Sequence, residues 1–436
     1  MRHHRPVVTL LLFLLVLLLA PSQASADRRR PARPPEPPKT AEEWLRRSAV
    51  PFATAEPRTG LEDLQPLRTM VGNARVVSLG EATHGTHEFF AMKHRILEFL
   101  VEEMGFTVFA IEANLPEADV VDDYVQRGEG DAATALSGMY FWTWNTDEVL
   151  DLIEWMRQYN LRRGDRPAVS FRGFDAQFAN VAVPRVRDYV ARVNATRAAE
   201  VRELYRCIDG LTRSTYHLLN LTQQKACRES IGRAHALLEQ NRSQYTAASS
   251  LEEYERHLRY ARVIVQAEAI WTDVSGPRDA FMAENTIWLT DTVHAGEKVV
   301  LWAHNFHVAA HDSVAMGYPL RQHYGSAMVV VGFAFDRGTF NAVSPQSGLG
   351  PQTIGSPQFG GYEQFFATAG HPRFLLDLRR PPPVAAQFLA QPKSIWSIGA
   401  GFNELQQPRF YRSTLSLDAA FDLIVYFETT TASRLR

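Results

Sequence analysis

A glutamate and a histidine that share one short turn are the residues of this chain best placed to do chemistry. An apolar run at 76–79 ends at Gly80, and the polar residues that follow include Glu81 and His84. An amphipathic helical pattern begins directly afterwards at 89–104. In an α/β protein, a strand–turn–helix of this kind presents its polar turn at the mouth of the sheet. Glu81 and His84 are therefore the first candidates for catalytic residues.

Three more apolar stretches of the sequence end in ionisable residues. Parallel strands place their carboxyl ends at one edge of a sheet, so groups that are far apart in the sequence meet there. We therefore expect these residues to share one site with Glu81 and His84. They are Glu112, Asp175, His304 and His307.

The expected chemistry is the activation of water by a histidine. An imidazole accepts a proton from water near neutral pH if a carboxylate orients it and stabilises the imidazolium. His84 is the predicted general base, with Glu81 or Glu112 as its acidic partner and His304 as a further catalytic candidate. Two crowded carboxylates raise the pKa of one of them, which would supply an acid for the leaving alcohol. The structural alternatives are a turn histidine bonded to backbone and a glutamate that caps the next helix.

Other residues near this edge are candidates for substrate binding. Lys93 lies about two turns beyond Thr86 on the predicted helix, where an ammonium group can stabilise an oxyanion. A solvated surface lysine is the alternative. His307 and Asp175 are also candidates for substrate binding. The alternative for His307 is a core residue, because histidines that follow a strand are often buried.

Several standard catalytic motifs are absent from the sequence. It contains no G-x-S-x-G nucleophile elbow, no Walker A loop and no G-x-G-x-x-G after a strand. The pair at 87–88 resembles the start of H-E-x-x-H, but residue 91 is Ala91. No zinc-type cysteine pairs occur either. We predict no cofactor, while a divalent metal held by His84, Glu112 and His304 stays open as an alternative.

The pattern of apolar runs predicts an α/β fold with a mainly parallel central sheet flanked by helices. Buried parallel strands are near-continuous apolar runs, and helical spacing separates them. Residues 183–288 carry little strand signal and predict an inserted helical cap. Residues 338–358 are rich in loop-forming types and predict a loop. The predicted strands are 76–79, 107–111, 168–171, 298–303, 327–335, 373–378 and 422–427.

The first 40 residues predict export of the protein and do not belong to the predicted folded domain. A basic start, an apolar core and a small-residue cleavage site at 24–26 are typical of a secretory signal peptide at 1–26. A basic, proline-rich stretch at 27–40 predicts an extended linker, which leaves 41–436 as the catalytic domain. We therefore expect a secreted, periplasmic or cell-envelope location. In such an oxidising compartment we favour pairing of Cys207 and Cys227, with two unpaired core cysteines as the alternative.

The charge balance excludes one class of partner. The 436 residues carry a net charge of -2 and are 45% hydrophobic, which is enough for a sizeable core. No basic field is available for nucleic acid. The expected partner is a small molecule, and no membrane span is expected after the signal segment.

Taken together, these motifs resemble the erythromycin esterase family. The resemblance covers nearly the whole predicted mature chain. It rests on the sequence at 80–86 and 88–89, then at 109–113, 142–144, 171–175, 278–279, 282–285, 302–307 and 421–424.

The resemblance implies hydrolysis of a macrolactone ester by a base-activated water, without a serine nucleophile, on an α/β core with a helical cap. It implies that His84 is the general base, with Glu81 and Glu112 as acidic neighbours and His304 and His307 as a second histidine pair. Within the matched motif at 278–279, Arg278 is a further candidate for substrate binding.

The hypothesis is an exported bacterial ester hydrolase for a bulky, largely apolar substrate, with macrolide inactivation and antibiotic resistance as one form of it. A metal-dependent hydrolase using the same residues and a non-catalytic secreted binding protein are the alternatives.

Overall fold

The computed structural model describes residues 36–273, 276–357 and 360–436. The predicted signal segment and most of the predicted linker lie outside these residues. The chain divides into two units, Met1–Pro37 and Pro38–Arg436, and every element described below belongs to the second unit. In the described part of the chain, no helix is both long and apolar enough to cross a membrane.

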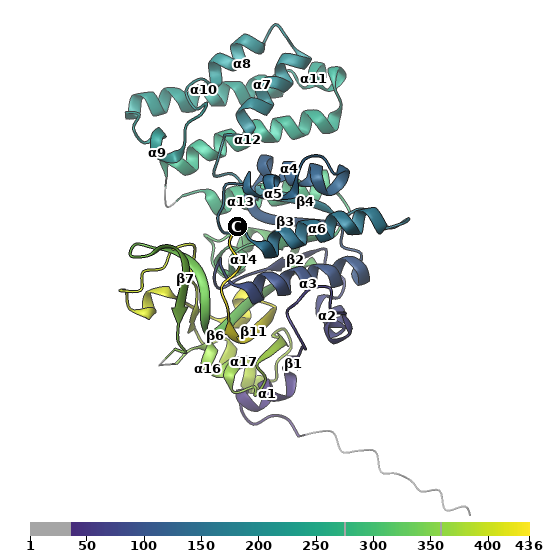
Figure 1. Cartoon of the computed structure of the whole chain (residues 1–436), viewed down its shortest axis with the longest axis vertical. Coiled ribbons are helices and arrows are strands. Elements are labelled where there is room, and N and C mark those ends of the chain that lie inside the picture. Colours follow the sequence, from purple (N-terminus) through teal and green to yellow (C-terminus); the bar gives the residue numbers. More distant parts are fainter. Residues whose placement is uncertain (1–35, 274–275, 358–359) are drawn as a thin grey trace, which may run out of the picture. The chain divides into compact units, whose positions relative to one another are not determined.

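A mainly parallel sheet forms the centre of the second unit (Figure 1). Within the described residues it has nine strands, in the order β1-β8-β11-β6-β2-β5-β3-β4, with β7 paired to β6. All neighbours from β11 to β4 are parallel, and only the β1–β8, β8–β11 and β6–β7 pairs are antiparallel. The predicted α/β fold is therefore confirmed. The strands are β1 (Val50–Pro51), β2 (Val76–Leu79), β3 (Val108–Asn114), β4 (Ser170–Asp175), β5 (Val299–Trp302), β6 (Met328–Ser344), β7 (Gly348–Ile354), β8 (Arg373–Asp377) and β11 (Leu423–Thr430).

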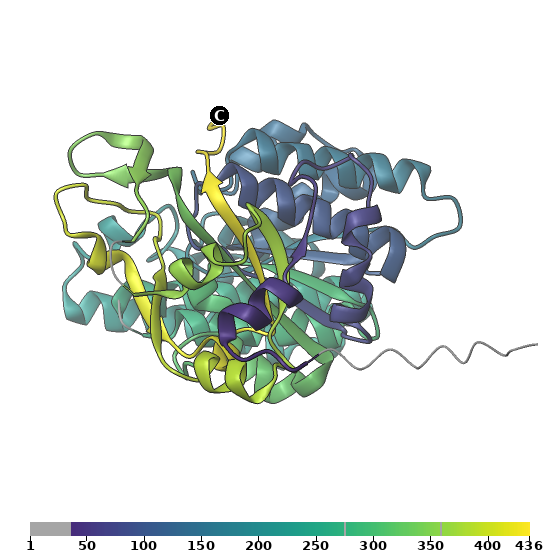
Figure 2. The same cartoon turned by 90° about the horizontal axis from the view of Figure 1, so that it is seen from below.

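The central strands are buried on both faces, which explains their apolar sequences. Along β2, Val76 packs into one hydrophobic cluster, whereas Val77 and Leu79 pack into the other. This follows from the alternation of side chains along a strand. Figure 2 shows helices coloured blue on one side of the sheet and green on the other.

Helices cover both faces of the sheet. The end of α3 is marked by Gly105, whose φ of 71° is in the left-handed region that favours glycine. The helices outside the cap are α1 (Ala41–Ser48), α2 (Pro66–Val71), α3 (His87–Met104), α4 (Leu115–Arg127), α5 (Ala132–Ser137), α6 (Asp147–Arg162), α13 (Arg278–Trp288), α14 (Asn305–Val308), α15 (Gly317–Tyr324), α16 (Tyr362–Ala367), α17 (Pro383–Leu389) and α18 (Leu417–Ala420).

A helical lobe falls in the region predicted as an insertion, at the top of Figure 1. It has its own hydrophobic cluster, in which Tyr205, Tyr245 and Ile264 are fully buried. Cys207 and Cys227 form a disulfide in this lobe, with an S–S distance of 2.12 Å, so their predicted pairing is confirmed. Its helices are α7 (Ala182–Val193), α8 (Ala198–Tyr205), α9 (Arg213–Tyr216), α10 (Leu221–Gln240), α11 (Arg242–Ala248) and α12 (Leu251–Thr272).

The prediction of a loop at 338–358 was wrong. There β6 continues to Ser344 and pairs with β7 as an antiparallel hairpin. The glycines, serines and prolines of this stretch hide the strand signal, because the pairing depends on the partner strand rather than on local propensity. A separate ribbon of β9 (Lys393–Trp396) and β10 (Arg412–Leu415) was also not predicted.

Candidate active site

The turn after β2 is fixed by close backbone packing. Gly80 donates its N–H to the Val331 carbonyl at 2.8 Å, and the Glu81 carbonyl accepts the Asn305 N–H at 2.8 Å. A Cβ on Gly80 would lie 2.1 Å from Asn305 Oδ1. The turn lies so close to α14 and β6 that only glycine fits at position 80. This close packing sets the direction of the Glu81 side chain.

Glu81 is a fully buried carboxylate that accepts three hydrogen bonds. Its Oε2 accepts from Lys93 Nζ at 2.6 Å and from Trp302 Nε1 at 2.8 Å, and its Oε1 lies 2.7 Å from His84 Nδ1. Lys93 is also fully buried. Burial lowers the pKa of Lys93 to about 8, against the attraction of Glu81, so the ammonium is retained at neutral pH. Two fixed donors thus hold Glu81 in place and leave its second oxygen for His84.

His84 is the member of this group that reaches the surface. Its side chain is 12% exposed, whereas that of Glu81 is 0% exposed. In a neutral imidazole, donation from Nδ1 to the Glu81 carboxylate leaves Nε2 as the acceptor nitrogen. The ring packs edge-on against Trp144 at 5.8 Å and lies 5.0 Å from the ring of His304. The Trp144 indole is itself fixed, since it donates to the Glu112 carbonyl at 2.9 Å.

Glu112 lies at the centre of a second, charged cluster. Its Oε1 accepts from Arg278 Nη2 at 2.6 Å, and its Oε2 accepts the His304 backbone N–H at 3.0 Å. The same Arg278 nitrogen lies 2.7 Å from Asp175 Oδ2. Arg278 therefore bridges Asp175, the last residue of β4, and Glu112, which lies inside β3 near its end at Asn114. The residues predicted to converge at this edge of the sheet thus lie together, although β3 extends past its predicted end at 111.

His307 completes this second cluster, where its Nε2 also lies 3.2 Å from Arg278 Nη1. Its Nδ1 lies 2.8 Å from Asp279 Oδ1, and its Nε2 lies 3.3 Å from Glu112 Oε1. Burial opposes the charge, but Glu112 and Asp279 outweigh it and raise the pKa of His307 to about 9. Conversely, although burial favours the neutral acid, His307 and Arg278 hold the pKa of Glu112 well below its usual range.

The predicted acid made by two crowded carboxylates is therefore not found at Glu112. Cationic groups lie between the carboxylates, so Glu112 stays ionised. Lys93 also differs from its predicted substrate-binding role, because it is buried against Glu81 and does not face solvent. It serves to position Glu81.

His304 lies between the two clusters but offers no free ring nitrogen. Its Nε2 lies 3.2 Å from the Ile398 carbonyl, and its Nδ1 accepts the Phe306 N–H at 3.2 Å. Burial and the neighbouring histidines lower the pKa of His304 well below its ordinary value. The neutral His304 ring thus separates the Glu81 cluster from the Glu112 cluster, and it also caps α14.

Three of the site's supporting residues were missed as site members by sequence reasoning. Trp302 belongs to an apolar strand sequence, Trp144 to an aromatic stretch typical of a core, and Asp279 follows Arg278 at a helix start. An aromatic N–H near a buried carboxylate gives no local sequence signal. Within the described residues, no group of three or more His, Cys, Asp or Glu side chains is arranged to hold a metal ion.

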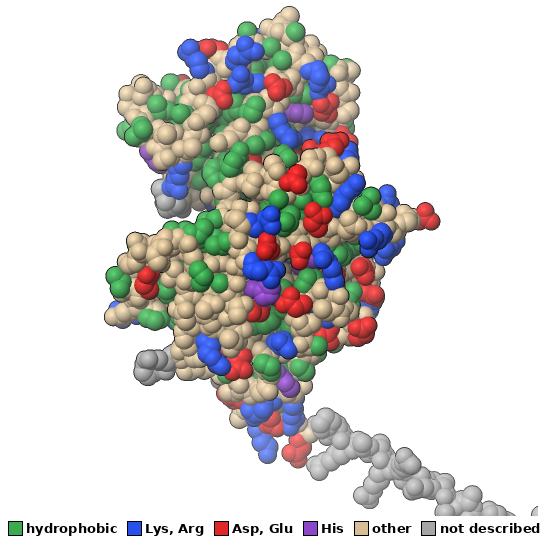
Figure 3. Space-filling view, viewed as in Figure 1, with side chains coloured by type: hydrophobic (Ala, Val, Ile, Leu, Met, Phe, Trp, Pro, Cys, Tyr) green, Lys and Arg blue, Asp and Glu red, His purple; other side chains and the backbone are tan. Residues whose placement is uncertain are grey.

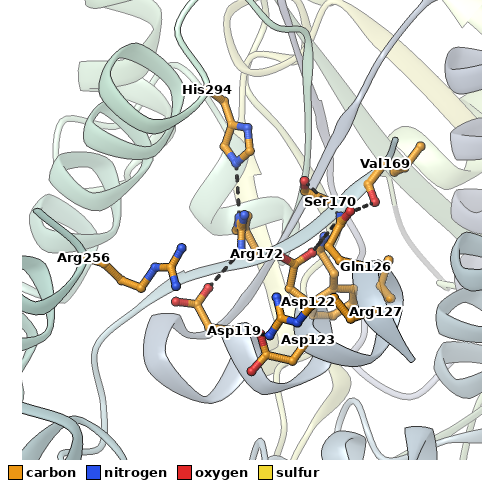
Figure 4. A network of polar contacts seen from close by, with 12 residues as sticks. Asp119, Asp122, Asp123, Gln126, Arg127, Val169, Ser170, Arg172, Arg256 and His294 are labelled. Atoms are coloured by element: carbon orange, nitrogen blue, oxygen red, sulfur yellow. Dashed lines mark hydrogen bonds and ion pairs between the residues drawn. The ribbon is translucent and has the colours of Figure 1, made fainter. Parts of the chain in front are cut away.

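A second polar network fixes the strand that carries Asp175 (Figure 4). Arg172 on β4 donates to Asp119 Oδ1 at 3.2 Å and to His294 Nε2 at 3.1 Å, and it pairs with Asp122 Oδ2 at 2.6 Å. Asp122 also accepts the Phe171 N–H at 2.8 Å. These bonds tie β4 to α4 and hold the strand end at which Asp175 meets Arg278.

The fold and the site define an α/β protein with a histidine–carboxylate centre suited to acid–base chemistry at the carboxyl edge of its sheet. The sequence model of the erythromycin esterase family matches residues 101–430, and the chain belongs to that family. The match contains Glu112, Arg278 and His307, whereas the Glu81–His84 turn lies before it.

Two relatives carry an esterase or hydrolase name. The chain is 24% identical to erythromycin esterase type II of Escherichia coli over 294 residues, or 61% of this chain and 68% of that protein. It is 26% identical to YbfO of Bacillus subtilis, named as a hydrolase, over 61% of this chain and 63% of that protein. The chain thus spans only about two thirds of the length of these relatives.

Three solved structures share the fold over almost the whole chain. A Bacillus cereus protein is 29% identical with a TM-score of 0.83, and a protein titled as a succinoglycan biosynthesis protein is 27% identical with a TM-score of 0.79. Each alignment covers 91% of this chain and 98% of the other. A mutant of the erythromycin esterase EreC in an open conformation is 16% identical with a TM-score of 0.69, covering 89% and 98%, and shows the fold alone.

The charge on His307 predicts a pH-dependent contribution to stability. A histidine whose pKa is raised from about 6.5 in the unfolded chain to about 9 in the fold stabilises the fold fully below pH 6.5. That stabilisation is lost as the pH rises through 9. The charge on His307 contributes at most roughly 3 kcal/mol to the free energy of unfolding. Asp279→Asn should move the titration of His307 toward its ordinary value, so the loss of stability should begin at lower pH.

The pKa is measured by NMR titration of the His307 imidazole, and the stability by urea unfolding at pH 6 and pH 9. Asp165→Asn, which removes an exposed carboxylate elsewhere, is the matched control. A native His307 that titrates near 6.5, or an unchanged titration in Asp279→Asn, would contradict the assignment.

Proposed function

We propose that this chain is an exported esterase that hydrolyses an ester or lactone of a bulky, largely apolar substrate with His84 as general base. The observation that carries the proposal is the single orientation of His84. Its Nδ1 is held by the buried Glu81 at 2.7 Å, its side chain is 12% exposed, and no hydrogen bond of its other ring nitrogen is found among the described residues. A histidine held in this way is prepared to take a proton from water.

The proposed reaction uses one water and no covalent enzyme intermediate. Nε2 of His84 removes a proton as the water oxygen attacks the ester carbonyl carbon, and Glu81 stabilises the imidazolium. When the tetrahedral intermediate collapses, the C–O bond to the alcohol breaks and His84 returns the proton to the leaving oxygen. The products are the acid and the alcohol.

The second cluster supplies two cationic donor groups for this reaction, Arg278 and His307, which are paired with three carboxylates. His307 is protonated at neutral pH, and the Arg278 side chain is 25% exposed. Fixed cations near a developing oxyanion lower the barrier because they need no reorganisation when the charge forms. Glu112 and Asp175 hold these cations in place, and neutral His304 separates them from His84.

Aromatic residues near the ends of β3 and β4 support a bulky, apolar substrate. Tyr140 is 55% exposed and has a φ of 63°, which is unusual for a residue other than glycine. Its ring contacts Phe178 at 5.9 Å, and Phe141 contacts the same ring at 5.2 Å. Phe178 follows Asp175 closely in the chain, and its carbonyl accepts from Asn114 at the end of β3. Exposed rings in strained backbone conformations are typical of binding sites.

The surface is hollowed between the helical lobe and the lobe that carries the β6–β7 hairpin (Figure 3). Hydrophobic side chains border this hollow on both sides, and α13 and α14 lie between the two lobes in Figure 1. An open, apolar approach of this kind suits a large ester. A macrolactone, as named in the family, is the first substrate to test, and the predicted signal at 1–26 supports action outside the cytoplasm.

His84→Gln should lower kcat by about 10²–10⁴ while leaving the fold intact, since it removes the base but keeps a hydrogen-bonding side chain at Glu81. Purified mature protein is assayed against a panel of lactones and aryl esters, with and without a chelator. His217→Gln, which alters an exposed histidine of the helical lobe, should keep full activity.

Activity within a few-fold of wild type in His84→Gln would reject His84 as the base. Activity lost to the chelator and restored by a divalent metal would favour the metal-dependent hydrolase instead. Ligand binding without turnover of any ester would favour the binding protein.

Tyr140→Gly should raise KM several-fold with little change in kcat. The substitution removes the exposed ring, and glycine adopts the positive φ without strain, so the stability of the fold should be retained or increased. KM and kcat are measured for a bulky and a small ester, and thermal unfolding is the control for folding. If the variant has the same KM as the native protein for each of the two esters, Tyr140 does not bind the substrate.

A further inference from the structure

The residues that follow β11, at 431–436, form a strap that crosses two segments of the candidate active site. In Figure 1 the strap is the yellow trace between β11 and the label C. The first segment is 85–88, directly after His84, and the second is 145–148, directly after Trp144. Because the Trp144 ring packs edge-on against the His84 ring, the backbone of both segments affects the position of His84.

The strap is bonded to the first segment mainly through its backbone. Ser433 donates its N–H to the Gly85 carbonyl at 3.0 Å, and His87 donates its N–H to the Thr431 carbonyl at 2.9 Å. Thr431 also donates its N–H and its hydroxyl to the two oxygens of Glu88, at 2.7 and 2.8 Å. These bonds hold the chain immediately after the candidate base.

Asn341 on β6 ties the strap and the turn to the sheet. Its backbone N–H donates to the Gly85 carbonyl at 2.9 Å, and its Nδ2 donates to the Ser433 carbonyl at 2.6 Å and to Ser433 Oγ at 3.1 Å. A Cβ on Gly85 would lie 2.3 Å from the Asn341 carbonyl oxygen. Asn341 and Ser433 are both buried, and a buried polar group left without its hydrogen bond costs about 1–3 kcal/mol.

The strap is also bonded to the segment after Trp144. Asp147 donates its N–H to the Arg434 carbonyl at 2.9 Å. The carboxylate of Glu148, which is buried, accepts the Arg434 N–H at 3.2 Å, and its Oε1 lies 2.7 Å from His87 Nδ1. Glu148 therefore joins the start of α6, the strap and the start of α3.

The strap lies at the surface rather than in the core. Ser433 is its buried residue, whereas residues 431 and 434–436 are exposed. A surface segment held chiefly by hydrogen bonds opens at a lower free energy than the core does. A loosened strap should therefore leave the sheet folded while it frees the turn that carries His84.

We infer that the strap, anchored by Asn341 and Glu148, positions His84 for its role as general base. The inference rests on the proposed function of His84. Asn341, Glu148 and Ser433 are positioning residues, because they act through the His84 turn and through the segment that carries Trp144.

Asn341→Ala tests the inference in the full mature chain, since it removes both side-chain bonds to Ser433 and keeps the backbone bond to Gly85. We expect kcat to fall about tenfold or more, while KM changes by less than kcat does, because a small misplacement of a reacting group lowers the rate steeply. In ¹⁵N–¹H NMR, the His84 Nδ1 proton should exchange faster with water than in the native chain.

Asn160→Ala is the matched control. It removes an asparagine that donates to the Val125 and Val169 carbonyls, and Val169 lies just before the amino end of β4, away from the site. It should lower the thermal stability without changing kcat or the His84 signal. Glu88→Ala is a second test of the strap, because it removes the partly exposed acceptor of Thr431, and it should change kcat and the His84 signal in the same direction as Asn341→Ala.

A native kcat together with a native His84 signal in Asn341→Ala would overturn the inference, as would equal losses in Asn341→Ala and Asn160→Ala. If Asn341→Ala does not fold, the same two readouts in Glu88→Ala decide. The His84 signal needs no turnover, so a native chain that hydrolyses no ester would count against the proposed function and would leave the NMR test of the strap in force.

Discussion

The buried carboxylate of Glu81 is the interaction on which the arrangement of the site depends. Lys93 and Trp302 donate to one of its oxygens and His84 approaches the other. Removing one partner of a buried ion pair typically costs 3–5 kcal/mol, because the remaining charge loses its compensation. The pair thus links the stability of the core to the orientation of a partly exposed histidine. A buried lysine and a buried tryptophan serve the site without touching its substrate.

The remaining parts of the site are arranged around this pair by the topology of the sheet. β2, β5, β3 and β4 are parallel neighbours, so the groups at their carboxyl ends meet. His304 lies between two differently charged environments. On one side Glu81 orients His84, and on the other Glu112 and Asp279 keep His307 charged. The proposed base and a cationic histidine thereby lie on opposite sides of His304.

Much of this arrangement follows from sequence pattern, because it depends on local signals. The apolar run of β2 and the polar residues after it predict both the strand and the chemistry of Glu81 and His84. Parallel pairing then predicts that Glu112, Asp175 and His304 come together. These inferences need only the strand rule and the residue types.

The rest depends on contacts between distant parts of the chain. Trp302 donates to a carboxylate 221 positions earlier, which no local pattern encodes. The β6–β7 hairpin was expected to be a loop, because its glycines and prolines weaken the strand signal while tertiary pairing supplies the order. The charged state of Glu112 was also missed, since it depends on Arg278 and His307 lying between the carboxylates rather than on the number of acids nearby.

The proton on His84 is the most direct test of the central claim. ¹⁵N–¹H NMR of the mature chain at neutral pH, with His84 assigned from the signals lost in His84→Gln, reports which ring nitrogen is protonated. The Glu81 bond predicts a proton on Nδ1 and a bare Nε2. A proton on Nε2 with a bare Nδ1 would contradict the account.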